Sequence, residues 1–337
     1  MRNLLFLYII FIIFTTAYAK GQVNELNIYS ERIEAISANI NAKIYTKIYE
    51  PIDNEKHPAI VMCPGSWEYS AAWDLYFPPF TPEFIAKEGF VVVTWDPRGS
   101  FIANPGGSDE LQFDLSNYGI GRSTPPFPPS ILMLNETLID DLYDVITYAN
   151  SLDRAQKNNI TIIGFSHGAT YPIIEKVTKT DERVSALVLI EPIGDESSVV
   201  DMVVGNIPNI GDTLVNVSKA IPENVYDRIL WEPLKNLPVP ILGLATEYAS
   251  GITIPVFVIQ TEQFHASITA PIFGGECTSP GVTLYTSLTN TPYKKLNRNA
   301  PNADISEIYD FFPAPIWDDG ELFCEYFTNE IKPVIEK

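Results

Sequence analysis

A serine between two glycines, within residues 164–168, is the clearest candidate for chemistry in this sequence. The run reads Gly-Phe-Ser-His-Gly and matches the pattern G-x-S-x-G, in which a sharp turn between a strand and a helix exposes a nucleophilic hydroxyl. It directly follows the apolar run 160–163 and directly precedes a helical pattern of apolar residues. The alternative interpretation is a turn that only starts a helix. The setting favours Ser166 as a nucleophile.

A nucleophilic serine needs a general base, and histidine is the usual one. The chain has three histidines, His57, His167 and His265. His57 precedes a strand at the far edge from the serine, and His167 lies inside the turn, where its side chain is expected to point away from Ser166. His265 follows the apolar run 256–259. By elimination we expect His265 to be the base, and the alternative is a surface or hydrogen-bonded loop histidine.

Two glutamates are candidates for the acid that orients the base. Glu247 comes after the strand-like run 240–244, and Glu191 comes directly after the apolar run 186–190. The run 240–244 and the next apolar run lie too close in sequence for a parallel crossover, which needs about a dozen residues. One of them is therefore not a parallel strand, or the two form a hairpin. We favour Glu247 narrowly and keep Glu191 as the other option.

Runs of apolar residues predict the elements that position these side chains. Continuous apolar runs are typical of parallel strands covered on both faces, and they lie at residues 59–63, 91–95, 160–164 and 186–190. Helical patterns separate them at residues 82–89, 138–149 and 169–177. Alternating residues within 24–49 predict antiparallel edge strands. The pattern predicts an α/β fold with a doubly wound, mostly parallel sheet.

Composition narrows the function classes. The chain has 337 residues, of which 46% are hydrophobic and 19% are charged, as expected for a globular protein with a sizeable core. The formal net charge is −20, and such an acidic surface repels phosphate backbones, so we expect no nucleic-acid partner. The three scattered histidines and the absence of paired cysteine spacing argue against a metal site, and we expect no cofactor.

The first residues predict export. A basic residue, an apolar run and a small-x-small cleavage site make residues 1–19 a candidate signal peptide. We expect one domain over residues 20–337, with residues 193–237 as a possible cap insertion. No later stretch is apolar enough for a transmembrane anchor, so the mature protein is expected to be secreted or otherwise extracytosolic.

An oxidising compartment changes how the cysteines and asparagines are interpreted. Cys63 lies in an apolar run and is expected to be a buried free thiol. Cys277 and Cys324 lie in polar surroundings and are expected to form a disulfide. Glycosylation sequons begin at three positions, of which the second adjoins a predicted strand and is the least suited to modification: Asn135, Asn159 and Asn216.

Three segments in this order resemble the α/β-hydrolase superfamily. Residues 60–67 resemble its strand and oxyanion loop, residues 90–99 its next strand with a D-x-R-G turn, and residues 164–168 its nucleophile turn. The chain is most similar to secreted single-domain esterases, such as polyester hydrolases and cutinase-like lipases. Extracellular phospholipid acetylhydrolases, which carry the acid at the strand end of Glu191, are a weaker match.

The resemblance implies roles for backbone groups and for one more pair of side chains. The N–H groups of Ser66 and His167 would form the oxyanion hole. Asp96 and Arg98 would tie the base of a loop together by an ion pair. We expect a secreted serine hydrolase that cleaves small-molecule or lipid-like carboxylic esters. The alternatives are a serine peptidase or acyltransferase of the same fold, and a non-catalytic binding protein.

Overall fold

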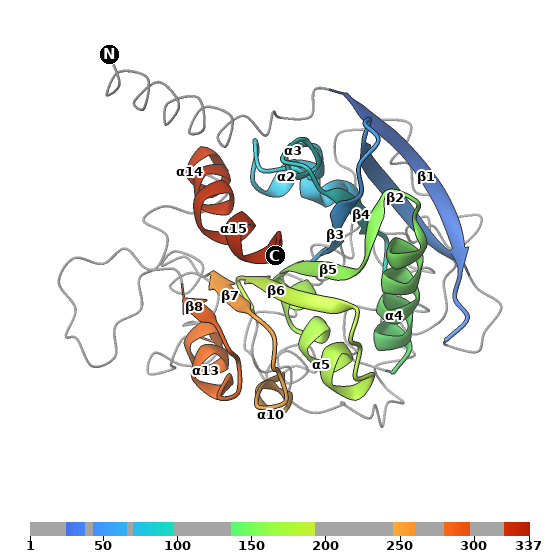
Figure 1. Ribbon diagram of the computed structural model, residues 1–337. Coiled ribbons are helices and arrows are strands. Elements are labelled where there is room, and N and C mark those ends of the chain that lie inside the picture. The colour runs from blue at the N-terminus through green and yellow to red at the C-terminus, as the bar shows by residue number, and fades with distance from the viewer. Residues whose placement is uncertain are drawn as a thin grey trace, which may run out of the picture.

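The computed structural model describes residues 25–37, 43–65, 70–97, 136–192, 245–259, 280–296 and 320–337. These residues form an eight-stranded sheet in the order β1-β2-β4-β3-β5-β6-β7-β8 (Figure 1). Strands β1 and β2 pair antiparallel, β2 pairs antiparallel with β4, and the other neighbours are parallel. The strands are β1 (Leu26–Glu34), β2 (Lys43–Pro51), β3 (His57–Cys63), β4 (Val91–Trp95), β5 (Ala155–Phe165), β6 (Val184–Ile190), β7 (Val256–Ile259) and β8 (Lys294–Leu296).

Helices cover both faces of the sheet (Figure 1). One face carries α4 (Glu136–Ser151), η5 (Ser166–Ala169), α5 (Tyr171–Thr178), α10 (Ala245–Ala249) and α13 (Pro280–Ser287). The opposite face carries α2 (Trp73–Tyr76), which follows η1 (Ser70–Ala72), together with α3 (Pro82–Lys87), α14 (Gly320–Tyr326), the π-helical turn η9 (Phe327–Ile331) and α15 (Lys332–Ile335). The predicted doubly wound, mostly parallel α/β sheet is therefore confirmed.

The central strands show why their sequences are continuously apolar. Every residue of β3 and of β4 is buried. In β3, Val61 packs into the core on the α4 and α5 face, and the next residue, Met62, packs into the core on the opposite face. Because successive side chains of a strand point to opposite faces, a sheet covered on both sides needs apolar residues at every position.

Aromatic rings join the C-terminal helices to the sheet. Phe80, two residues before α3, lies 4.1 Å from Phe323 of α14 and 5.5 Å from Phe327 of η9 between ring centroids. Lys332 at the start of α15 donates to the carbonyl oxygen of Glu88 at 2.7 Å and pairs with its carboxylate at 2.9 Å. These contacts hold the end of the chain on the face opposite α4 and α5.

The sequence predicted most of these elements. The runs 59–63, 91–95, 160–164 and 186–190 are strands, the three expected helices are α3, α4 and α5, and the antiparallel edge is β1 and β2. The three-residue strand β8 was not predicted. The signal peptide predicted at residues 1–19 and the cap predicted at 193–237 lie outside the described residues. None of the helices that the structure describes is long and apolar enough to cross a membrane.

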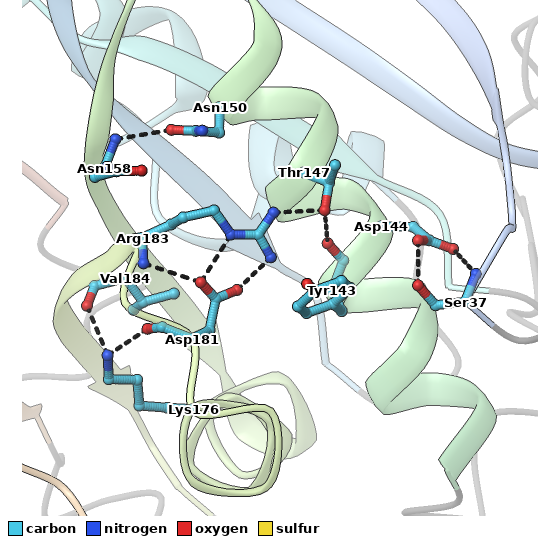
Figure 2. Close-up of polar contacts among 10 residues, drawn as sticks. All are labelled: Ser37, Tyr143, Asp144, Thr147, Asn150, Asn158, Lys176, Asp181, Arg183 and Val184. Carbon is cyan, nitrogen blue, oxygen red and sulfur yellow. Dashed lines mark hydrogen bonds and ion pairs between the residues drawn. The ribbon is translucent and has the colours of Figure 1, made fainter.

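A buried charge network fastens α5 to the start of β6 (Figure 2). Arg183 donates to the carboxylate of Asp181 from Nε at 2.7 Å and from Nη2 at 2.5 Å, and its guanidinium lies over the ring of Tyr143. Partial burial opposes ionisation of Asp181, but the hydrogen bonds and charge of Arg183 lower its pKa. Lys176 of α5 also donates to the carbonyl oxygens of Asp181 and Val184.

Glu175 of α5 is fully buried next to this network. Burial, and then the neighbouring charge of Asp181, raise the pKa of Glu175 well above its ordinary value. A carboxyl group whose pKa is higher in the folded state stays protonated in the fold while the unfolded chain loses its proton. The fold therefore loses stability as the pH rises above the ordinary range of a glutamate.

We expect Glu175→Gln to remove this loss, because the amide is neutral at every pH and still offers N–H groups to Asp181. The free energy of unfolding of the variant should exceed that of the unchanged protein at pH 8, and the difference should shrink towards pH 4. Urea unfolding at both pH values measures it. A variant that is less stable than the unchanged protein at pH 8 would contradict the assignment of a neutral Glu175.

Candidate active site

Ser166 lies at the turn between β5 and the helical segment that follows it. It comes directly after Phe165, the last residue of β5, and it is the first residue of η5. Its φ is +54°, in the left-handed region that non-glycine residues rarely adopt. A backbone strained in this way costs about 1–3 kcal/mol and concentrates at functional sites. The predicted strand–turn–helix setting of the serine is confirmed.

The glycines on either side of Ser166 are required by backbone packing. A Cβ atom on Gly164 would lie 1.9 Å from the carbonyl oxygen of Gly168. A Cβ atom on Gly168 would lie 2.3 Å from the carbonyl oxygens of both Cys63 and Pro64. The turn is therefore pressed against the chain that leaves the end of β3. This contact brings the serine next to the segment in which the sequence predicts the oxyanion loop.

The two predicted oxyanion donors differ in what the structure describes. Ser66 lies outside the described residues, and the buried Gly65 directly precedes it. His167 is described and buried, and its imidazole packs edge-on against Tyr171 of α5 at 5.5 Å between ring centroids. Its ring therefore lies on the α5 side of the turn, while its backbone directly follows Ser166.

Polar side chains lie below the turn in an apolar environment. Burial raises the pKa of the Cys63 thiol to about 12, and burial also raises the pKa of Tyr171 well above its ordinary value. The indole ring of Trp95 packs edge-on against Tyr171 at 6.2 Å. Both ionisable groups are thus neutral at physiological pH. The expectation of Cys63 as a buried free thiol is confirmed.

Glu191 lies at the end of the strand next to β5. Phe165 pairs with Ile190 in the parallel ladder, so Ser166 and Glu191 each come one residue after a directly paired position. Neighbouring strands lie about 4.8 Å apart, which makes the two backbones close neighbours. Glu191 is fully buried, has a φ of +49°, and donates its backbone N–H to the carbonyl oxygen of Ile259 at 2.7 Å.

Glu247 lies on a helix, whereas the sequence suggested a position at the end of a strand. Residues Ala245 and Ala249 are the buried ends of the short helix α10, and Glu247 is on its exposed side. It therefore lies on a helix in the crossover that precedes β7, rather than at the end of a strand. The run 240–244 lies outside the described residues, and the run 256–259 is the parallel strand β7 (Val256–Ile259). The geometry favours Glu191 over Glu247.

The two described histidines, His57 and His167, lie at opposite ends of the parallel strands β3 and β5. His57 is the first residue of β3, about 20 Å from the carboxyl end of that strand. Its ring nitrogens contact the carbonyl oxygen of Gly89 and the carboxylate of Asp53, each at 3.0 Å. His265 lies outside the described residues, six positions after the end of β7. Among the residues that the structure describes, no group of His, Cys, Asp and Glu side chains is arranged to hold a metal ion.

The predicted disulfide is not found. Cys324 is a free cysteine on α14, packed in the core on the α3 face, and its burial raises the pKa of the thiol to about 12. Cys277 lies outside the described residues. The polar surroundings of Cys324 in the sequence suggested a disulfide with Cys277, but α14 turns the Cys324 side chain towards the apolar core.

The structure describes one of the three predicted glycosylation sequons, the one that begins at Asn159. Asn159 lies within β5, where its amide oxygen accepts a hydrogen bond from the Ser185 hydroxyl at 3.1 Å and its amide nitrogen donates to Gln156 at 3.0 Å. A side chain engaged inside a sheet is a poor glycan acceptor, as its sequence position suggested. Asn135 and Asn216 lie outside the described residues.

One contact near the site was not predicted. The carboxylate of Asp96 accepts a hydrogen bond from the backbone N–H of Ser70 at 2.8 Å. The sequence suggested an ion pair with Arg98, which lies outside the described residues. The sequence could not predict the bond to Ser70, because its donor is a backbone N–H 26 positions away and a backbone donor does not depend on the type of its residue.

The fold is that of known esterases and hydrolases, although no protein-family model and no curated protein matches the sequence. An esterase from Pyrococcus furiosus has a TM-score of 0.56 and 16% identity, over 92% of this chain and 93% of that one. An α/β hydrolase from a Penicillium species has a TM-score of 0.55 and 14% identity, over 92% and 99%. Acetyl xylan esterase 1 from a Thermoanaerobacterium species has a TM-score of 0.51 and 15% identity, over 93% and 86%. The chain has the α/β-hydrolase fold.

We expect Gly168→Ala to destabilise the protein by about 3 kcal/mol or more, because a methyl group at this position meets backbone atoms that no rotamer change can move. Gly251→Ala is the matched control, since its Cβ would meet mainly the side chain of Val177 at 3.0 Å. Thermal unfolding of both variants measures the difference. Equal melting temperatures for the two would contradict the tight contact between the turn and β3.

Proposed function

We propose that this chain is an exported serine hydrolase that cleaves carboxylic esters through an acyl-enzyme intermediate. The observation that carries the proposal is the left-handed backbone of Ser166, in a turn where Gly164 packs against Gly168 and Gly168 packs against the chain leaving β3. Backbone strain at a serine in a G-x-S-x-G turn is the signature of an exposed nucleophile. The esterase names of proteins that share the fold support the reaction class.

In the proposed reaction, the Oγ atom of Ser166 attacks the ester carbonyl carbon while His265 takes its proton. The carbonyl oxygen becomes an oxyanion, for which the N–H groups of Ser66 and His167 are the proposed donors. The tetrahedral intermediate then collapses, and the leaving alcohol receives the proton from His265. Water, activated by the same base, attacks the acyl-enzyme and releases the carboxylic acid, which restores Ser166.

Glu191 is the proposed acid. Its N–H bonds the carbonyl oxygen of Ile259, the last residue of the strand that leads towards His265. It also lies beside the end of β5, one residue after the partner of Phe165. The carboxyl ends of β5, β6 and β7 share one edge of the sheet, so Ser166 and Glu191 lie at the same edge, and the chain towards His265 starts from it. This common edge supports Glu191, whereas Glu247 lies on α10 before β7 begins.

The proposed substrate is a small-molecule or lipid-like ester. Phe165, directly before the nucleophile, is partly exposed and stacks edge-on against Phe77 of the α2 region at 5.2 Å. The flank of Ser166 on this face is therefore aromatic. An aromatic flank suits the apolar acyl or alcohol part of an ester better than it suits a charged substrate.

The first test is covalent labelling with a fluorophosphonate probe. We expect the folded protein to be labelled, and Ser166→Ala to abolish labelling and lower kcat for p-nitrophenyl esters by about 10³-fold or more. Ser151→Ala is the matched control, since Ser151 is an exposed serine at the end of α4. A well-folded protein that is not labelled would instead favour a non-catalytic binding protein. Faster turnover of aminoacyl amides than of esters would favour a peptidase.

The second test separates the proposed base and acid. We expect His265→Ala to lower kcat by about 10³-fold or more, and Glu191→Gln to lower it by about 10²- to 10⁴-fold, because each removes one member of a triad. Glu247→Gln is the matched control and should stay near the activity of the unchanged enzyme. Steady-state kinetics on one ester measures all three. The reverse order for the two glutamates would make Glu247 the acid, and an active His265→Ala would exclude His265 as the base.

A further inference from the structure

Asp96 is a buried carboxylate directly after β4, on the edge of the sheet where Ser166 lies. Its backbone N–H donates to the carbonyl oxygen of Tyr45 in β2 at 3.0 Å, so its backbone continues the sheet. Its Oδ1 atom accepts the backbone N–H of Ser70 at 2.8 Å, and Ser70 is itself only 2% exposed. Asp96, fixed at the end of β4, thus holds the backbone N–H of Ser70 at the start of η1.

The element held in this way is the end of the connection between β3 and η1. The connection starts where the carbonyl oxygens of Cys63 and Pro64 pack against Gly168, and its far end is Ser70, the first residue of η1. Four positions, 66–69, separate the buried Gly65 from Ser70. The chain is therefore anchored on both sides of this short stretch, by backbone packing at one end and by Asp96 at the other.

We propose that Asp96 is a positioning residue for catalysis: through the N–H of Ser70, it fixes the far end of the connection that carries the first oxyanion donor. The inference rests on the proposed function, because it concerns the same serine hydrolase chemistry. An oxyanion donor contributes only when it points at the place where the charge develops, and an error of about 1 Å in placement lowers the rate by about 10²-fold. Asp96 touches no reacting atom in this scheme and acts through Ser70.

A second buried carboxylate provides the control for a merely structural role. Asp144 of α4 accepts the backbone N–H of Ser37 at 2.8 Å and the Ser37 hydroxyl at 2.6 Å (Figure 2). The bond to the backbone has the same length as that between Asp96 and Ser70. Asp144, however, lies on the helix α4, whereas Asp96 lies at the end of a central strand. Removing the bond of Asp144 should cost stability in a similar way without moving the connection after β3.

The test compares Asp96→Leu, Asp96→Asn and Asp144→Leu by steady-state kinetics on a p-nitrophenyl ester. We expect Asp96→Leu to lower kcat by about 10- to 100-fold, with KM within about 3-fold of the unchanged enzyme. Asp96→Asn keeps an acceptor for the Ser70 N–H and should restore most of kcat, and Asp144→Leu should keep kcat. A kcat unchanged in Asp96→Leu, or lowered equally in Asp144→Leu, would overturn the inference.

Two further outcomes remain decisive. If Asp96→Leu does not fold, Asp96→Ser replaces it, because a small hydroxyl leaves the core intact but is too short to reach Ser70. In that case, a kcat of Asp96→Ser equal to that of Asp96→Asn overturns the inference. A folded, unchanged protein that is neither labelled by a fluorophosphonate nor active on esters refutes the proposed function, and the inference with it. An active enzyme whose kcat does not change when Asp96 is replaced refutes the inference about Asp96 and leaves the proposed function standing.

Discussion

The contact between Gly168 and the carbonyl oxygens of Cys63 and Pro64 fixes the position of the Ser166 turn against the end of β3. The two segments reach this contact because β3 and β5 pair in parallel from Ala59 and Ile160 up to Cys63 and Gly164. Their carboxyl ends therefore finish side by side, and no side chain fits between the turn after one and the chain leaving the other. The glycines around the serine follow from this backbone contact, and the direction in which the chain leaves β3 follows from it as well.

Two of the four non-glycine residues with a positive φ in the described part of the chain lie at this edge of the sheet. Ser166 and Glu191 both have a positive φ, and each comes directly after the end of a central parallel strand. A left-handed backbone at a non-glycine residue costs about 1–3 kcal/mol, and the surrounding structure must impose it. The ladder between β5 and β6 and the bond from Glu191 to Ile259 impose it here. The sheet thus holds two polar residues at neighbouring strand ends in conformations they would otherwise avoid.

The polar groups beneath the site are kept neutral. Burial raises the pKa of Cys63 and Tyr171, and burial together with the charge of Asp181 raises the pKa of Glu175. All three lie on or beside α5, the helix that follows the turn at Ser166. A negative charge below the turn would oppose the oxyanion of the proposed reaction, because charges interact strongly in a medium of low dielectric constant. Tyr171 and Glu175 of α5 thus carry no negative charge themselves.

Local patterns in the sequence were sufficient to predict the strand–turn–helix setting of Ser166 and most of the sheet. The run 91–95 is a strand with these bounds, and the glycines around Ser166 predicted the sharp turn that the structure contains. Such features depend on burial and on backbone conformation at single positions, and the type of residue at a position indicates both. The short polar strand β8 has no such pattern, because a three-residue edge strand is defined by its pairing with β7 rather than by its own side chains.

Only the tertiary structure could separate the two glutamates and find the anchor at Asp96. Glu247 follows an apolar run in the sequence just as Glu191 does, but it lies on the exposed side of α10, whereas Glu191 is buried beside the nucleophile strand. The bond from Ser70 to Asp96 joins residues 26 positions apart. The sequence by itself thus determined the sharp turn at Ser166 and the class of fold. The order of the strands decided which distant residues surround that turn, because neighbours across a parallel sheet are set by long-range pairing that no local pattern encodes.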